Sequence, residues 1–169
     1  VDKDEQGIGE IRVKGPNIML GYLNNKEATD EVLVDGWFHT GDLGYVDDEN
    51  YLFFTGRKKN LIILDNGKNV FPEDIESCVM ETIKYVREVV AFETHKTVHD
   101  NDHKIIAVGV YVDPSDFPGK TQEEITRLTK EAMTEVNRKL SAYKRVQDVM
   151  VCFKEFPKTS TKKVIRQSV

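Results

Sequence analysis

A short polar and basic stretch at residues 56–60, Gly-Arg-Lys-Lys-Asn, divides the chain into two halves of different character. The first half alternates apolar and polar positions and is rich in turn-forming residues, which indicates β-structure. In the second half, longer apolar blocks follow one another with the spacing of a hairpin, helices and strands. We therefore predict a boundary in this stretch, with one portion over residues 1–57 and a second over residues 58–169.

The second half carries start signals for two helices, at Pro72 and at Thr121. Pro72 suits the first turn of a helix, where its missing N–H leaves no hydrogen bond unmade, and Glu124 completes a capping-box pattern with Thr121. Asn66-Gly67 between apolar stretches predicts a β-hairpin, because both residues tolerate a positive φ. Strands are predicted at residues 88–92, 105–112 and 149–153. Together these elements predict an α+β fold in which helices cover a small sheet.

Three elements are expected in the first half. Residues 9–16 alternate polar and apolar side chains and end at a proline, which predicts a half-buried strand. Residues 24–34 place their apolar side chains near helical spacing, so we predict a short helix there. Residues 44–54 are typical of two strands joined by an acidic turn.

Composition narrows the class of protein. The net charge of −5 argues against a nucleic-acid partner, which usually requires a basic face. No apolar run approaches the roughly 20 residues of a transmembrane helix, and the first residues lack the pattern of a signal peptide. Cys78 and Cys152 are isolated in apolar surroundings, which favours free thiols in a reducing compartment. We therefore expect a cytoplasmic protein.

Three short segments carry the residues best suited to chemistry: 36–42 (GWFHTGD), 55–59 (TGRKK) and 157–166 (PKTSTKKVIR). Each also has an ordinary explanation, namely a strand ending in a tight loop, a surface cation at a strand end and a solvated basic terminus. Their order along the chain resembles that of the adenylate-forming (acyl-activating) enzymes, and the resemblance covers essentially the whole chain. Within this superfamily the chain is most similar to acyl-CoA synthetases, particularly long-chain fatty acid–CoA ligases.

The resemblance implies the carboxy-terminal portion of such an enzyme. The Ser/Thr/Gly-rich phosphate loop ending in Lys is missing from this sequence, so the fragment alone is expected to be inactive and to need the missing amino-terminal domain of the same enzyme. The implied fold is a small mixed sheet packed with helices, a mobile cap preceded by the β-rich end of the large domain. The implied reaction activates a small-molecule carboxylic acid as acyl-AMP and transfers it to CoA, with ATP, Mg²⁺ and CoA as cofactors.

The same resemblance implies roles for individual residues. Lys163 takes the place of the catalytic lysine, whose ammonium bridges the attacking carboxylate and the α-phosphate as charge develops there. Asp42 takes the place of the acid that accepts hydrogen bonds from the ribose hydroxyls, and Arg57 that of a nucleotide-binding cation. The family places a glycine where this chain has Lys162, which predicts a less pliable loop and leaves both lysines as candidates for the phosphate.

Three further positions follow from the resemblance. Lys59 occupies the place of the hinge about which the cap rotates between the two half-reactions. Gly67 and Asn69 occupy the turn that meets the pantetheine arm of CoA, where the lack of a side chain lets the thiol approach. Glu76 is expected to support the hinge region.

Alternatives remain open at this point. His95, His99 and His103 are spaced by four residues, but the polar residues among them break a helical pattern, so we expect no metal site. The parent enzyme could load a carrier protein in place of free CoA, or the chain could be a non-catalytic interaction module with the same fold. The sequence leaves open the length of the acyl chain and the oligomeric state.

Overall fold

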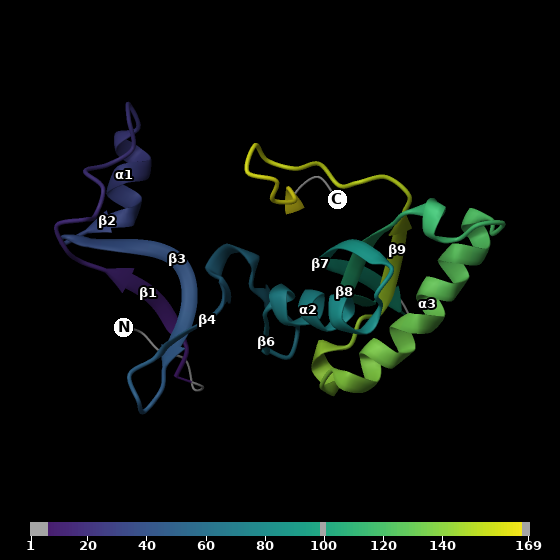
Figure 1. The fold of residues 1–169 in the computed structure, drawn as a ribbon. Coiled ribbons are helices and arrows are strands. Elements are labelled where there is room, and N and C mark those ends of the chain that lie inside the picture. Colours follow the sequence, from purple (N-terminus) through teal and green to yellow (C-terminus); the bar gives the residue numbers. More distant parts are fainter. Residues whose placement is uncertain (1–6, 99–100, 167–169) are drawn as a thin grey trace. The chain divides into compact units, whose positions relative to one another are not determined.

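The computed structural model of the chain describes residues 7–98 and 101–166. The chain forms two compact units, Val1–Leu61 and Ile62–Val169 (Figure 1). Our predicted boundary, between residues 57 and 58, remains a prediction.

The first unit is an antiparallel sheet built around one long strand, β3 (Trp37–Val46). Strands β1 (Gly9–Val13), β2 (Leu33–Val34) and β4 (Leu52–Arg57) all pair with it. Helix α1 (Lys26–Val32) begins at Asn25, whose side-chain oxygen accepts a hydrogen bond from the Ala28 N–H. The three elements expected in this half are therefore confirmed.

One glycine of this sheet is required by close packing. Gly44 lies in β3, where an added Cβ would come within 2.4 Å of the Phe53 carbonyl oxygen. Strand β4 can therefore approach β3 closely only because this position has no side chain.

The second unit is a mixed sheet of three strands with two helices (Figure 1). Strand β8 (Asn101–Val112) pairs antiparallel with β7 (Val86–Val98) and parallel with β9 (Asp148–Cys152). Helices α2 (Pro72–Thr82) and α3 (Gln122–Lys139) contribute to one core with the sheet. The predicted α+β class, a small mixed sheet packed with helices, is confirmed.

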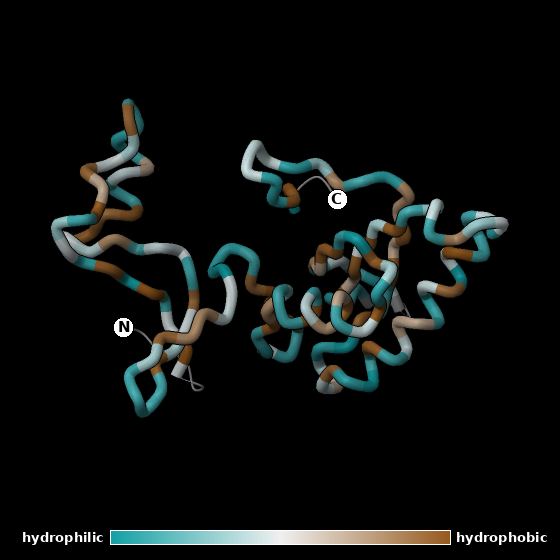
Figure 2. The backbone as a smooth tube through the Cα atoms, in the orientation of Figure 1, coloured by the Kyte–Doolittle hydropathy of each residue, from teal (hydrophilic) through white to brown (hydrophobic). Residues whose placement is uncertain are grey.

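The core of this unit lies between the helices and one face of β8. Alternate residues of β8 are buried in it, as expected for a strand whose successive side chains point to opposite faces: Ile106, Val108, Val110 and Val112. The helices contribute Ile75, Val79, Ile125, Met133 and Val136. Figure 2 shows the hydrophobic segments gathered where these elements meet, with hydrophilic stretches on the outer turns of α3.

Both helix starts are confirmed. Pro72 is at the first position of α2, and Thr121 and Glu124 form both hydrogen bonds of the capping box at the start of α3. The buried face of α3 includes one polar residue, Thr129, which is fully buried. Thr129 meets its polar requirement by donating a hydrogen bond to the Ile125 carbonyl, so a hydroxyl is tolerated in this core.

The two strands of the central hairpin are longer than predicted. Strands were expected at residues 88–92 and 105–112, but β7 and β8 pair from Val86 to Val98 and from Asn101 to Val112. Residues 93–104 are largely polar, so their sequence lacks the apolar alternation that marks a half-buried strand. The strand structure of residues 93–98 and 101–104 comes from pairing across the hairpin.

A short hairpin precedes α2, as predicted. Strands β5 (Ile62–Ile63) and β6 (Asn69–Val70) pair around a turn in which the Gly67 N–H donates to the Leu64 carbonyl at 2.8 Å. The turn has three loop residues, and only Gly67 has a positive φ, +76°. Asn66 acts through its side chain, which accepts a hydrogen bond from the Lys68 N–H.

Among residues 7–98 and 101–166, none of the helices is long and apolar enough to cross a membrane. Cys78 and Cys152 are free thiols. Burial raises the pKa of Cys152 above its usual value.

Candidate functional site

Asp42 and Arg57 are brought together in the first unit. They are register partners of β3 and β4, and Arg57 Nε lies 2.9 Å from Asp42 Oδ1. The Arg57 side chain is about half exposed, at 47%, and that of Asp42 is 27% exposed. The sequence named both residues, but only the strand register shows that they form an ion pair.

The segment Thr40-Gly41-Asp42 forms a bulge inside β3. The partners of β3 shift from Arg12 opposite His39 to Glu10 opposite Leu43, which leaves the three residues facing a single residue of β1. Gly41 has a φ of +69°, a left-handed conformation that glycine adopts without strain. The strand therefore continues through this segment, where the ordinary explanation had it ending in a tight loop, and the bulge redirects the Asp42 side chain.

Glu10 organises this bulge, and sequence reasoning missed it. One carboxylate oxygen of Glu10 accepts a hydrogen bond from the Gly41 N–H at 3.2 Å, and the other lies 3.1 Å from His39 Nδ1 and 3.4 Å from Lys58 Nζ. Burial raises the pKa of Glu10, but the hydrogen bond with His39 and the charge of Lys58 outweigh that effect and hold it below its usual value. The only sequence feature that pointed to Glu10 was a charged residue in a predicted half-buried strand. The neighbouring residues in the sequence did not reveal its partners.

Lys59 lies in a single 3-10 turn, η1 (Lys58–Asn60), directly after β4. Its side chain is exposed, and the second unit begins three residues later, at Ile62. Gly67 and Asn69 are both exposed in the second unit, and an added Cβ at Gly67 would meet no atom within 4 Å. Near this hairpin, Lys68 Nζ lies 4.5 Å from the centre of the Tyr143 ring.

Lys163 lies at the base of a closed hairpin in the tail. The Thr159 N–H donates to the Lys163 carbonyl at 2.8 Å, and the Lys162 N–H donates to the Thr159 carbonyl at 2.9 Å. The Lys163 N–H donates to the Thr159 hydroxyl at 3.2 Å. Lys162 has a φ of +61°, so it occupies the left-handed position at which glycine would be unstrained.

The four cations of the tail divide into two kinds. Lys158 pairs with Glu88 and Glu155, and hydrogen bonds to Glu155 and Glu88 raise the pKa of Lys158 above its usual value. Arg166 pairs with Glu76 and Glu73. Lys162 and Lys163 are exposed and form no ion pair within the described part of the chain.

Glu76 contacts the tail and a strand of the second unit. Its carboxylate binds Arg166 of the tail and accepts a hydrogen bond from the Ala91 N–H, while its expected support of the hinge region stays a prediction. The residue therefore holds the tail against α2 and β7.

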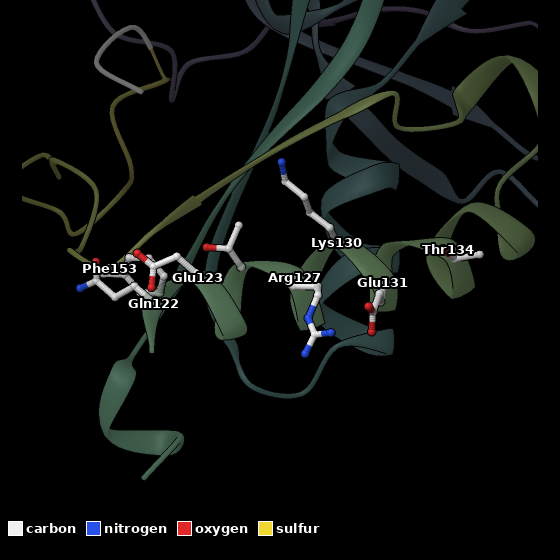
Figure 3. Close-up of a pocket in the computed structure, with 8 residues that line it drawn as sticks. Gln122, Glu123, Arg127, Lys130, Glu131, Thr134 and Phe153 are labelled. Carbon is white, nitrogen blue, oxygen red and sulfur yellow. The ribbon is translucent and has the colours of Figure 1, made fainter. Parts of the chain in front are cut away.

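A hollow on the surface of the second unit lies elsewhere. It has a volume of about 700 Å³ and follows the exposed side of α3, and none of the predicted site residues lines it. Figure 3 shows Lys130 and Arg127 pointing in opposite directions from the helix. The side chains do not converge on a common point, which a specific ligand site requires.

The register of β7 and β8 separates two of the histidines considered as metal ligands. His95 is paired with Lys104 and His103 with Lys96, so His95 and His103 point to opposite faces of the hairpin. His99 lies outside the described residues. Within residues 7–98 and 101–166, no group of three or more His, Cys, Asp or Glu side chains is arranged to hold a metal ion.

Comparison with known proteins identifies relatives over most of the chain. A family model described as "AMP-binding enzyme C-terminal domain" matches residues 59–169. A 2-succinylbenzoate–CoA ligase of Bacillus cytotoxicus is 35% identical and covers 95% of this chain, and a long-chain-fatty-acid–CoA ligase of Escherichia coli is 33% identical and covers all of it. The chain spans 30% and 28% of the lengths of these two relatives.

Solved structures agree with this assignment. O-succinylbenzoate coenzyme A synthetase from Bacillus subtilis, in complex with ATP and magnesium ion, is 28% identical with a TM-score of 0.73, over 95% of this chain and 30% of that one. A fatty acyl CoA synthetase of Mycobacterium tuberculosis is also 28% identical, with a TM-score of 0.55, over 95% of this chain and 29% of that one.

Proposed function

We propose that this chain, which belongs to the family of AMP-binding enzyme C-terminal domains, is the carboxy-terminal part of an ATP-dependent acyl-CoA synthetase. In the first half-reaction a carboxylic acid attacks the α-phosphate of ATP, giving acyl-AMP and pyrophosphate. In the second, the thiol of CoA attacks the acyl-AMP, giving acyl-CoA and AMP. Residues 1–57 would belong to the large domain and residues 58–169 to the mobile cap.

The observation that carries this proposal is the unpaired state of Lys163. The tail around it is ordered by backbone hydrogen bonds, and the neighbouring cations Lys158 and Arg166 are neutralised by carboxylates. Lys163 is exposed and, in the described part of the chain, has no carboxylate partner. An ammonium held in this way can move to where negative charge develops on a phosphate, which is the task of a cation in phosphoryl and nucleotidyl transfer.

The first unit fits the nucleotide. Asp42 is fixed by its ion pair with Arg57 and by its backbone N–H, which donates to the Thr40 hydroxyl at 3.0 Å. A carboxylate fixed in this way can accept hydrogen bonds from the two hydroxyls of a ribose. The half-exposed Arg57 is available to a phosphate oxygen at the same place.

The hairpin at Gly67 fits the thiol half-reaction. Gly67 and the neighbouring Asn69 are exposed, and the space around the missing Cβ of Gly67 is open. We propose that the pantetheine arm of CoA passes here after the cap has rotated about Lys59. Mg²⁺ would be held by the triphosphate and by residues outside this chain, since the described residues contain no acidic cluster for it.

The remainder of the enzyme is the main partner of this chain. The first unit leaves many large apolar side chains exposed, among them Leu20, Leu23, Tyr51, Leu52 and Phe54. Tyr45 and Phe53 stack on the same sheet with their ring centres 5.1 Å apart. An apolar surface of this kind is typical of a face covered by another part of the protein, which supports the missing amino-terminal domain as its partner.

The acid that we propose is a fatty acid. The support is the long-chain-fatty-acid–CoA ligase of Escherichia coli, whose similarity extends over the whole chain. The 2-succinylbenzoate–CoA ligases are equally similar, so the test sets a fatty acid against 2-succinylbenzoate. Loading of a carrier protein is a second candidate acceptor reaction, and comparing carrier protein with free CoA separates the two. A non-catalytic interaction module predicts no turnover with any of these substrates.

The test uses Lys163→Ala in the full-length enzyme that contains this chain. ATP–pyrophosphate exchange should fall by roughly 100- to 1,000-fold, the usual loss when one group that stabilises developing charge is removed. Thioester formation from supplied acyl-AMP and CoA should persist. Lys162→Ala shows whether the neighbouring lysine contributes, and Lys120→Ala is the control for an exposed lysine elsewhere. Undiminished exchange in the Lys163→Ala enzyme would contradict the role proposed for this lysine.

A further inference from the structure

The tail hairpin that carries Lys163 is held to the body of the second unit at both ends. At its start, Lys158 pairs with Glu88 and with Glu155, the latter at 2.7 Å. Phe156, two residues before Lys158, is also fixed, because its N–H donates to Glu88 at 2.9 Å and its ring is buried. At its end, Arg166 binds Glu76. The hairpin between these anchors is therefore a tethered loop.

The Arg166–Glu76 contact is a two-point interaction. Arg166 Nη1 donates to Glu76 Oε1 at 2.6 Å, and Arg166 Nη2 donates to Glu76 Oε2 at 2.8 Å. The two parallel bonds fix the direction of the guanidinium as well as its distance. Only 28% of the Arg166 side chain and 17% of the Glu76 side chain are exposed, so solvent screens this pair less than an ordinary surface pair.

The pair is in turn fixed by the backbone of an edge strand. Glu76 Oε1 accepts a hydrogen bond from the Ala91 N–H at 2.8 Å, and Arg166 Nη1 donates to the Ala91 carbonyl at 3.2 Å. Ala91 lies in β7, which is at the edge of the three-stranded sheet. The two side chains thus satisfy the outward N–H and C=O that a neighbouring strand would otherwise pair with.

Arg166 and Lys163 are linked by a short stretch of hydrogen-bonded backbone. The Ile165 N–H donates to the Pro157 carbonyl at 2.8 Å, and Val164 forms a bridge with Lys158. Lys163 follows directly, with its own N–H and carbonyl bonded to Thr159. The residues from 163 to 166 are therefore a short connection, held by hydrogen bonds at Lys163 and Ile165, between the sheet edge and the Lys163 ammonium.

We infer that Arg166 and Glu76 are positioning residues for Lys163. They do not touch the substrates; they fix the base of the loop from which the Lys163 side chain extends. The inference rests on the proposed function of Lys163 in adenylation. Loss of either partner keeps Lys163 in the chain but removes the contact that fixes its position. A misplacement of about 1 Å can lower a rate by about 100-fold.

The first experiment measures both half-reactions for Arg166→Ala in the full-length enzyme. We expect the kcat of adenylation to fall by about 10- to 100-fold with a smaller change in the KM for ATP, and thioester formation from supplied acyl-AMP to be retained. Arg138→Ala is the matched control, since Arg138 forms an exposed ion pair with Glu135 on α3, away from the tail. Equal losses in the two variants would overturn the inference.

A double-mutant cycle separates positioning from a general structural role. If Arg166 acts only through Lys163, Arg166→Ala causes no further loss of adenylation in an enzyme that already carries Lys163→Ala. A full additional loss in that background would overturn the inference. If Lys163→Ala itself leaves adenylation intact, the proposed function of Lys163 fails, and the two failures are thereby distinguished.

A third measurement does not depend on activity. Amide hydrogen exchange of the same proteins should rise at least about tenfold at Lys163 and Ile165 in Arg166→Ala and Glu76→Gln, while the amides of α3 keep their protection. Arg166→Lys keeps the charge but cannot form two parallel bonds, so we expect intermediate exchange and intermediate adenylation. Unchanged tail exchange in Arg166→Ala would mean that the contact does not hold the hairpin.

Discussion

The hairpin around Gly67 and the hairpin around Lys162 share one backbone design but differ in the residue at its most demanding position. In each, two backbone hydrogen bonds close a three-residue loop. In the first hairpin, Leu64 bonds to both Lys68 and Gly67. In the second, Thr159 bonds to both Lys163 and Lys162 in the same way. The last loop residue is left-handed in both, with a φ of +76° at Gly67 and +61° at Lys162. Glycine adopts this conformation freely, whereas an L-residue with a side chain is disfavoured by about 1–2 kcal/mol.

The two hairpins also differ in how they are attached. The first continues into β5 and β6, and Asp65 at its tip accepts a hydrogen bond from the Lys104 N–H at 3.1 Å. The second has a single bridge and is attached through the side chains of Lys158 and Arg166. Backbone pairing resists displacement in water and salt, whereas ion pairs of partly exposed side chains respond to both. The attachment of the hairpin around Lys162 is therefore the one that should respond to salt.

The largest expected effect comes from placing a side chain at the glycine. Gly67→Ala should lower the free energy of unfolding of the second unit by about 1–2 kcal/mol, because the left-handed φ becomes strained while the space around the Cβ is open. Urea unfolding measures the loss. The matched variant is Gly119→Ala, because Gly119 is in the same unit, has a φ of +80° and has open space around an added Cβ. It should lose a similar free energy of unfolding. Gly7 lies in the other unit and is therefore not a suitable match. An unchanged midpoint in both variants would contradict the strain argument.

The converse substitution should stabilise the tail. Lys162→Gly removes the strain of a left-handed lysine but adds the backbone freedom of glycine to the unfolded chain, so we expect a net gain of about 0.5–1 kcal/mol in the local stability of the hairpin. Slower amide exchange at positions 162 and 163 would show it. Lys163→Gly, at the next position, lacks the strained φ and serves as the control. Faster exchange in Lys162→Gly would rule out strain at this residue.

An effect of the same order is expected from releasing the tip of the first hairpin. Asp65→Ala removes the acceptor of the Lys104 N–H and should cost about 0.5–1.5 kcal/mol, the usual net contribution of one hydrogen bond. Exchange at Lys104 should accelerate, and exchange at Lys163 should not change. Asp148→Ala provides a comparison at an exposed acid, since its side chain bonds only to the adjacent Val149 N–H among the described contacts.

The smallest effect is that of salt. Raising the ionic strength from about 0.05 M to about 1 M shortens the screening length from more than 10 Å to about 3 Å, so the ion pairs at Lys158 and Arg166 should weaken and amide exchange at Lys163 and Ile165 should rise about two- to fivefold. Exchange at Gly67 should stay constant, because backbone pairing holds that turn. Equal responses of the two hairpins would show that they are attached in the same way.

Sequence reasoning was most successful where the cause of a structure lies within a few residues. Pro72 and the pair Thr121–Glu124 begin helices because of their own bonds to the next turn, and Gly67 marks a turn because of its own φ. The same reasoning underestimated β7 and β8, whose polar ends become strands only by pairing with each other. It also missed Glu10, because the partners of that carboxylate come from β3 and η1, about 30 and 50 residues away.

The tail illustrates the limit most directly. Its sequence alone determined that four cations and three hydroxyls stand in a short segment whose order matches the adenylate-forming enzymes. It did not determine which cations are free, because Lys158 finds Glu88 at a separation of 70 residues and Arg166 finds Glu76 at a separation of 90. Local propensity acts within one turn of chain, whereas an ion pair depends on where the folded sheet and helix bring distant carboxylates. The tertiary structure therefore decided that Lys158 and Arg166 hold the loop and that Lys162 and Lys163 have no carboxylate partner within the described part of the chain.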